Sequence, residues 1–267
     1  MGYYIAGGAL WVLVAVYLGW RIRRSMKMLL QAPPEMTWLI YLVVFTLCAP
    51  LIALTGSRSQ SAGIAALVGA FVISFALSYW ALAKARDFCR EKDMLPPAGG
   101  VMLCAVSGGR DSMALLSFLE QLAAEKGFIL HAAHYNHMLR PTADRDEDFV
   151  RLWCADRHIP LACGTCDVRA WAREQGASLE DAARTLRYRF LEETADRVGA
   201  QRIATAHHVQ DNAETVLLHL LRGTGLKGLC GMEPRTARRI RPHLTVTRAE
   251  ILVYLHENGL SWREDSS

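Results

Sequence analysis

The pattern of apolar positions divides the chain into two parts. Within residues 1–86 there are three long apolar stretches, at about 3–20, 37–55 and 62–83, and none of them contains Asp, Glu, Lys or Arg. Stretches of about 18 to 22 residues can cross the roughly 30 Å apolar core of a bilayer as α-helices. The pattern therefore predicts a membrane anchor with three transmembrane helices; buried core helices of a soluble protein are the alternative.

Basic residues are spread unevenly around these stretches and predict their orientation. They cluster after the first stretch, occur once between the second and third, and follow the third as a pair, in the set Arg21, Arg23, Arg24, Lys27, Arg58, Lys84 and Arg86. Because positively charged loops stay on the cytoplasmic side, the N-terminus is expected outside and residues 87–267 in the cytoplasm. This second part holds 23 basic and 25 acidic residues, so any RNA binding there needs local basic patches.

From about residue 88 the pattern changes to short apolar runs that alternate with amphipathic helices. The candidate strands are residues 101–106, 129–135, 159–163 and 202–206. The candidate helices are residues 112–125, 144–157 and 179–198. Strands that alternate with helices predict an α/β domain with a doubly wound parallel sheet, which binds its ligands beyond the carboxyl ends of the strands.

The first candidate strand runs into a glycine turn, Ser-Gly-Gly-Arg-Asp-Ser at residues 107–112, and then into a helix. This order directs backbone N–H groups and a helix N-terminus at phosphate. The loop lacks the spacing and lysine of a Walker motif. Asp111 is expected to hold Mg²⁺ or to orient a nucleotide. The expected ATP-binding residues are Ala105, Ser107, Gly108, Gly109, Arg110, Asp111 and Ser112.

A second polar motif follows the fourth candidate strand. If residues 207–215 are helical, then His207, Asp211 and Glu214 fall on one face of the helix. Two carboxylates and an imidazole on one face can bind a metal, orient a base or accept a proton. An exposed acidic helix start, favoured by the helix dipole, is the alternative.

A third motif opens the long helix at residues 179–198. Ser178 has the position of an N-cap, and Glu180, Arg184 and Arg187 then repeat the one-face spacing. These side chains can form surface ion pairs, or the arginines can clamp a phosphate or adenylate. Arg222, which belongs to the last motif at residues 221–226, can also reach phosphate.

Taken in this order and spacing, the glycine turn and the motifs at 134–141, 178–188, 206–215 and 221–226 resemble the tRNA(Ile)-lysidine synthetase family of N-type ATP pyrophosphatases. The resemblance covers about residues 86–267. It implies the adenine nucleotide α-hydrolase-like fold of PP-loop ATPases. It also implies a ligase that uses ATP and Mg²⁺, L-lysine, and a tRNA(Ile) with a CAU anticodon.

In that family the wobble cytidine is adenylated with release of pyrophosphate, and the lysine amine then displaces AMP to leave lysidine. The resemblance implies catalytic roles for Asp111, Arg184, Arg187, His207, Asp211 and Glu214. It implies contacts to substrate or tRNA for His134, Asn136, His137, Arg140, Glu180 and Arg222.

Two other functions remain open. A tRNA 2-thiolation enzyme shares the ATP loop and has paired cysteines, and Cys163 and Cys166 form such a pair here. In thiolation enzymes, however, the pair directly precedes the arginine-rich helix, whereas here residues 167–183 intervene. Two ordinary thiols are therefore preferred over a metal or cluster site.

The other alternative is a non-catalytic membrane protein that carries a remnant of a nucleotide-binding domain. Members of the family are usually soluble, and they continue beyond Trp262 to Ser267 into helical and C-terminal tRNA-binding domains. The expectation is an intact adenylation site with weak tRNA binding in the 267-residue form.

Overall fold

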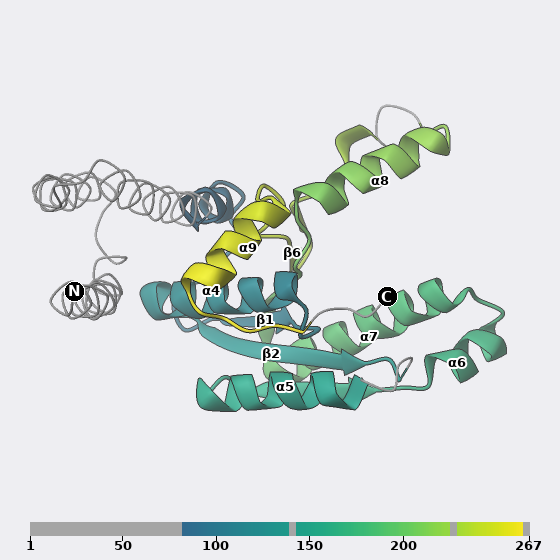
Figure 1. The fold of residues 1–267 in the computed structure, drawn as a ribbon, viewed down its shortest axis with the longest axis horizontal. Coiled ribbons are helices and arrows are strands. Elements are labelled where there is room, and N and C mark those ends of the chain that lie inside the picture. Colours follow the sequence, from purple (N-terminus) through teal and green to yellow (C-terminus); the bar gives the residue numbers. More distant parts are fainter. Residues whose placement is uncertain (1–81, 139–142, 225–228, 264–267) are drawn as a thin grey trace, which may run out of the picture. The chain divides into compact units, whose positions relative to one another are not determined.

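A computed structural model describes residues 82–138, 143–224 and 229–263 of the chain (Figure 1). Within these ranges, no helix is both long and apolar enough to cross a bilayer. The three expected membrane helices lie outside the described residues, except for the last two residues of the third. Arg140 also lies outside them.

The described part is built on one six-stranded sheet in the order β3-β2-β1-β4-β6-β5. The strands are β1 (Val101–Ala105), β2 (Ile129–Asn136), β3 (Leu161–Thr165), β4 (Ala200–Ala204), β5 (Arg235–Thr236) and β6 (Arg239–Ile240). All neighbours pair in parallel except β5, which is antiparallel to β6. The predicted parallel α/β sheet is confirmed, with an added two-residue hairpin at one edge.

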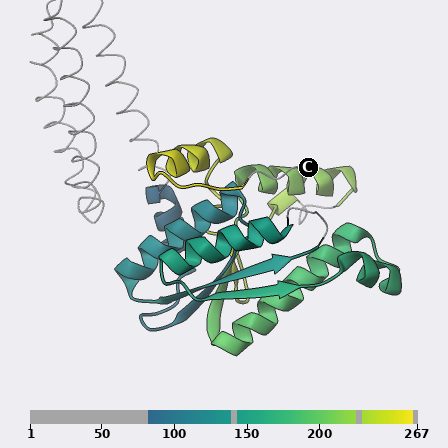
Figure 2. The same ribbon diagram turned by 60° about the horizontal axis from the view of Figure 1, so that its bottom comes forward.

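Helices cover both faces of this sheet. In Figure 2, α4 (Arg110–Lys126) and α5 (Ala143–Asp156) lie over one face, and α7 (Leu179–Val198) lies under the other. Two shorter helices form an outer layer: α6 (Val168–Gln175) packs on α7, and α9 (Arg248–Glu257) packs on α4. The segments that follow β1 and its two neighbouring strands therefore lie close together at the carboxyl end of β1, as in other doubly wound sheets.

The alternation of side chains along β1 explains the two layers. Met102 and Cys104 are fully buried in the core shared with α4 and α5, whereas Leu103 is fully buried against Leu191 of α7. Successive strand residues point to opposite faces, and burial of each such side chain contributes about 1.5–3 kcal/mol. An apolar run without alternation is therefore what a strand covered on both faces requires.

Most predicted elements are present, with their ends shifted by one or two residues. The helix predicted at residues 179–198 has these bounds, and Ser178 caps it by accepting a hydrogen bond from the Asp181 N–H at 3.1 Å. The elements that the sequence pattern missed are α6, α9 and the β5–β6 hairpin. The two-residue strands of the hairpin and the eight-residue α6 are too short for a clear periodicity.

The condition that residues 207–215 are helical is met only from Val209 onward. The helix α8 (Val209–Leu221) begins two residues later, with His208 as its N-cap in an extended conformation. Asp211 accepts a hydrogen bond from the His208 N–H at 2.8 Å, which fixes the start of the helix. His207 therefore belongs to the strand-to-helix turn rather than to the helix face that carries Asp211 and Glu214.

Candidate active site

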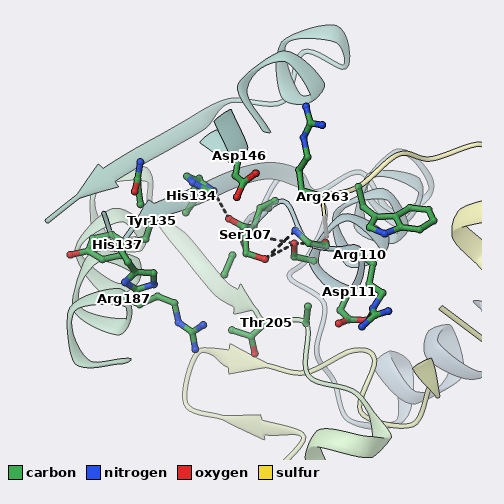
Figure 3. Close-up of a pocket in the computed structure, with 18 of the residues that line it drawn as sticks. Ser107, Arg110, Asp111, His134, Tyr135, His137, Asp146, Arg187, Thr205 and Arg263 are labelled. Atoms are coloured by element: carbon green, nitrogen blue, oxygen red, sulfur yellow. Dashed lines mark hydrogen bonds and ion pairs between the residues drawn. The ribbon is translucent and has the colours of Figure 1, made fainter. Parts of the chain in front are cut away.

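A cavity of about 720 Å³ opens at the carboxyl ends of β1, β2 and β4. This is the position at which a doubly wound sheet binds its ligands. The predicted residues that line it are Ala105, Ser107, Gly109, Arg110, Asp111, Ser112, His134, Asn136, His137, Arg187, His207 and Asp211. Figure 3 shows Ser107 in the middle of this group, with Arg187 and Asp111 on opposite sides of it in that view.

The glycine turn is locked by its two serines. The Ser107 N–H donates to Ser112 Oγ at 3.1 Å, and the Ser112 hydroxyl donates to the Gly109 carbonyl at 2.8 Å. The Arg263 N–H donates to the Gly108 carbonyl at 2.9 Å and joins the last described residues to the loop. The first N–H groups of α4 have no partner within their own helix, so the loop presents donors and a positive helix end to an anion.

Gly108 and Gly109 have different roles in this turn. Gly108 is buried and has φ +89°, and a Cβ there would lie 3.4 Å from Val150 Cγ2. Gly109 is the N-cap of α4 at φ −72°, which any residue can adopt. The left-handed conformation thus makes Gly108 the glycine that the fold of the loop requires.

We expect Gly108→Ala to lower both stability and ATP affinity. A left-handed alanine costs about 1 kcal/mol, and the strained loop no longer holds its N–H groups in place. Gly99→Ala is the matched control, because Gly99 has φ +77° with open space around its Cβ and lies outside the cavity. Urea unfolding and ATP titration should show similar stability losses in the two variants and weaker ATP binding in Gly108→Ala alone. Equal ATP affinities would contradict this role.

Asp111 is half-buried, and its Oδ1 atom is buried without a hydrogen-bond partner. Burial raises the pKa of this carboxyl, and the charges of His208, Arg110 and Arg248 oppose the rise. Its Oδ2 atom lies 3.8 Å from His208 Nε2. Arg110 Nε lies 3.8 Å from Oδ1, beyond hydrogen-bond distance. A buried acceptor that lacks a hydrogen bond and faces a cavity is suited to a donor on a ligand or to a cation.

His208 is buried between two carboxylates of the site. Its Nδ1 atom lies 3.5 Å from Asp211 Oδ2, and its Nε2 atom faces Asp111. The imidazole thus fixes the spacing between the carboxylate of the loop helix and the carboxylate at the start of α8. The sequence motif contained His208, but only the fold shows which of the two adjacent histidines has this bridging position.

His207 enters the cavity as a neutral imidazole. Burial, together with the charges of Arg241, Arg187 and Arg184, lowers its pKa to about 4, although Asp211 opposes the shift. Its Nδ1 atom lies 3.0 Å from Thr205 Oγ1. The side chain can therefore donate or accept one hydrogen bond at neutral pH without carrying a charge.

The end of β2 supplies the opposite wall of the cavity. His134 Nδ1 contacts the Val106 carbonyl at 2.9 Å, and burial lowers the pKa of this histidine. The Asn136 amide donates to Asp144 Oδ1 at 3.1 Å and to Glu147 Oε2 at 3.3 Å. These hydrogen bonds hold the end of β2 in place. A predicted contact of His134 or Asn136 with substrate would have to form in addition to them.

Five of the predicted site residues that the structure describes do not line the cavity: Gly108, Glu180, Arg184, Glu214 and Arg222. Glu180 is exposed in the first turn of α7, two turns from Arg187. Glu214 is exposed on α8, and Arg222 is exposed as the C-cap of that helix. No residue of α8 is buried, and the helix projects from the sheet in Figure 1. The expectation that Glu214 shares a cavity-facing side with His207 is therefore wrong.

The cavity also has lining residues that the sequence did not single out, among them Asp146, Thr205, Arg248, Trp262 and Arg263. Thr205 directly follows β4, so the rule about strand ends could have found it. Arg248 and Arg263 come from the segment around α9, whose packing onto α4 no local pattern predicts. These residues add positive charge to the loop side of the cavity.

Neither Cys163 nor Cys166 lines the cavity. Both are half-buried free thiols on or just beyond β3. Burial raises the pKa of Cys163 to about 11, and Cys166 packs in a small cluster with Tyr135 and Val168. Within the described residues, no group of three or more His, Cys, Asp or Glu side chains could hold a metal ion.

The parallel sheet, the glycine turn at the end of β1 and the cavity above it define an α/β nucleotide-binding domain of the doubly wound class. The particular family is shown by a match over residues 85–267 to the PP-loop domain. The chain belongs to this PP-loop family. The family shows that the domain uses ATP.

The most similar relatives include tRNA(Ile)-lysidine synthases. The protein from Dehalococcoides mccartyi is 43% identical over 185 residues, which cover 66% of this chain and 39% of the relative. The protein from Bacillus subtilis is 42% identical over 188 residues, covering 68% and 39%. The protein from Chlorobaculum tepidum is 45% identical over 176 residues, covering 66% and 53%. The chain thus spans about two-fifths to one-half of the length of these relatives.

Among solved structures, the chain is similar to the U34-tRNA thiolase NcsA from Methanococcus maripaludis, described with its [4Fe-4S] cluster. The TM-score is 0.59 at 16% identity, over 73% of this chain and 68% of that one. At this identity the likeness concerns the fold alone. It agrees with the parallel α/β fold and says nothing of thiolation.

Proposed function

We propose that the chain is a tRNA(Ile)-lysidine synthetase, which joins L-lysine to the wobble cytidine of a tRNA(Ile) with a CAU anticodon. One observation carries this proposal. The phosphate-binding turn and the uncharged His207, with Asp211 and Arg187, face one cavity. Relatives that are 40–45% identical bear this activity in their names.

In the first step, O2 of the cytidine attacks the α-phosphorus of ATP, and the bond to the β-phosphate breaks to release pyrophosphate. The glycine turn and the N-terminus of α4 hold the phosphates, because both line the cavity and the first N–H groups of a helix attract anions. Arg187 approaches from α7, on the other side of Ser107 (Figure 3). It is placed to neutralise charge that develops on the transferred phosphate.

Asp111 also fits a magnesium site. Its buried Oδ1 atom has no hydrogen-bond partner, and the phosphate oxygens of the substrate would complete the hard oxygen ligands that Mg²⁺ prefers. Bound there, Mg²⁺ would lower the negative charge of the triphosphate. Asp111 itself would hold the ion, and His208 would hold Asp111.

In the second step, the lysine amine attacks C2 of the adenylated cytidine, O2 leaves with AMP, and the amine loses a proton. Asp211 lines the same cavity, and its carboxylate can accept this proton. His207, neutral because its pKa is about 4, can hydrogen-bond the cytosine while Thr205 fixes its ring. Leu191 and Ala133 supply apolar contact for the base.

Incubation of the full chain with ATP, L-lysine and the tRNA(Ile) transcript tests this function. Digestion to nucleosides and mass analysis should reveal lysidine, formed together with AMP. The matched control is a transcript with uridine in place of the wobble cytidine, which should remain unmodified. ATP binding without either product would instead favour the nucleotide-binding remnant.

The thiolation alternative predicts an iron–sulfur chromophore that depends on Cys163 and Cys166. The position of both thiols outside the cavity disfavours it. Anaerobic reconstitution followed by iron analysis distinguishes the two functions. A cluster lost in the double serine variant would favour thiolation.

We also propose that residues 1–86 anchor the chain in the membrane with residues 87–267 in the cytoplasm. The three uncharged stretches and the basic residues between them support this proposal. We expect a cysteine placed at Ser59 to react with an impermeant reagent in intact cells, and one placed at Ser25 to react only after lysis. The reverse pattern would put the ATP site outside the cell and would contradict both proposals.

A further inference from the structure

Four arginines converge on one aromatic side chain beside the active-site cavity. The guanidinium carbons of Arg184, Arg187 and Arg239 lie 5.4, 5.2 and 4.8 Å from the ring centre of Tyr188. Arg241 follows Arg239 by two residues, and its charge acts on both Tyr188 and His207. We call these five residues the Tyr188 cluster.

The cluster is held together by two separate parts of the chain. Arg184, Arg187 and Tyr188 belong to α7, whereas Arg239 and Arg241 belong to β6 and the residue after it. Glu192 of α7 lies 3.6 Å from both Arg238 and Arg239 and ties the hairpin to the helix. The convergence is thus fixed by tertiary packing.

The positive charge of the cluster is only partly balanced. Arg184 and Arg187 form no ion pair with any residue that the structure describes. The carboxylates that face the group are Glu192, at 3.6 Å from Arg239, and Glu233, beside Arg241. Nearby like charges repel one another, so an anion between them would relieve this repulsion.

The electrostatics of Tyr188 and Arg241 agree with an excess of positive charge. Burial alone would raise the pKa of Tyr188, but Arg187, Arg184 and Arg241 outweigh it and the pKa lies below its usual value. Burial lowers the pKa of Arg241, and Arg239 and Arg184 lower it further. In addition, the Nε atom of Arg241 is buried without a hydrogen-bond partner.

The cluster is not part of the phosphate loop. Of its members only Arg187 lines the cavity, and the loop lies at the end of β1 across that cavity. Arg184 is exposed, so a macromolecule can reach it. One guanidinium group can bind a phosphate through two parallel hydrogen bonds. An aromatic ring among arginines is a common binding surface for RNA.

We propose that Arg184, Arg239 and Arg241, arranged around Tyr188, bind a phosphodiester of the RNA substrate next to the nucleotide that enters the cavity. This second anion site is separate from the one that holds ATP. The identity of the RNA in this proposal rests on the proposed function. The domain has no net positive charge, and this anion site provides a local basic patch where the reacting base must enter.

The test compares RNA and ATP binding in the full chain, without turnover. The probe is the anticodon stem-loop of tRNA(Ile) with a CAU anticodon, titrated at several salt concentrations. Arg184→Gln and Arg239→Gln should each weaken RNA binding about tenfold, the scale of one hydrogen bond to a charged group. Each should also lower the slope of log K against log salt by about 0.7, the value for one phosphate of a single strand. ATP affinity should stay the same.

Arg238→Gln is the matched control, because Arg238 adjoins Arg239 but its guanidinium lies 2.6 Å from Asp196. It should change neither RNA affinity nor the slope. Unchanged RNA binding in both cluster variants would overturn the proposal, as would wild-type protein that binds no stem-loop. A loss of ATP affinity instead would assign the cluster to the triphosphate. Stem-loop binding without lysidine formation would contradict the proposed function but leave the second anion site standing.

Discussion

Asp111→Asn should lower kcat by about 10²-fold or more, which corresponds to about 3 kcal/mol of lost transition-state stabilisation. Asparagine has nearly the shape of aspartate, so the loop should keep its conformation while it loses the charge beside the phosphates. The buried Oδ1 atom without a hydrogen bond and the raised pKa of this carboxyl are the reasons for placing it at the reacting groups. Lysidine formation under saturating ATP is the measurement.

Asp148→Asn is the control for this effect. Asp148 is an exposed residue of α5 that does not line the cavity, and its variant should keep turnover within about twofold, the range of ordinary surface changes. Turnover of Asp111→Asn close to that of the unmodified chain would mean that the carboxylate neither holds Mg²⁺ nor contacts the nucleotide.

Arg187→Gln should lower kcat/KM by about 10²–10³-fold, the usual effect of removing one donor to a developing oxyanion. Arg187 lines the cavity and forms no ion pair within the described part of the chain. Its charge is therefore available to a substrate phosphate. Arg187→Lys should restore part of the rate, because it keeps the charge but loses the paired donors of the guanidinium.

Arg189→Gln tests whether this loss is specific to the cavity side of α7. Arg189 lies two residues further along the same helix, is exposed and pairs with Glu193 at 2.8 Å. We expect its variant to change kcat/KM by no more than about twofold. Similar losses in the two glutamine variants would indicate a general effect of helix charge, and Arg187 would then have no direct role.

Much of the fold could be predicted from local patterns. Val101 to Val106 has no polar residue, and a strand buried on both faces requires such a run. The loop at residues 107–112 could be placed because its glycines and serines define a turn without help from distant residues. By contrast, α9 was missed, although Thr247 and Glu250 form a capping box that could have shown its start.

The candidate site could be predicted only where the residues directly follow a strand. Ser107, His134 and His207 lie at predicted strand ends, and all three line the cavity as expected. Helical spacing failed for Glu214, because the capping of α8 by Asp211 moved the start of the helix past His207. The packing of Arg239 against Tyr188 joins residues 51 positions apart, and no local pattern contains such information.

In the proposed reaction, ATP is consumed by adenylation of the wobble cytidine and not by attack of water. A reaction of the full chain with ATP, L-lysine and the tRNA(Ile) transcript in water enriched in oxygen-18 tests it most directly. If O2 of the cytidine attacks the α-phosphorus and later leaves with AMP, lysidine should form and the AMP should contain no oxygen-18 from the solvent. AMP that carries solvent oxygen-18, or AMP formed without lysidine, would contradict the account.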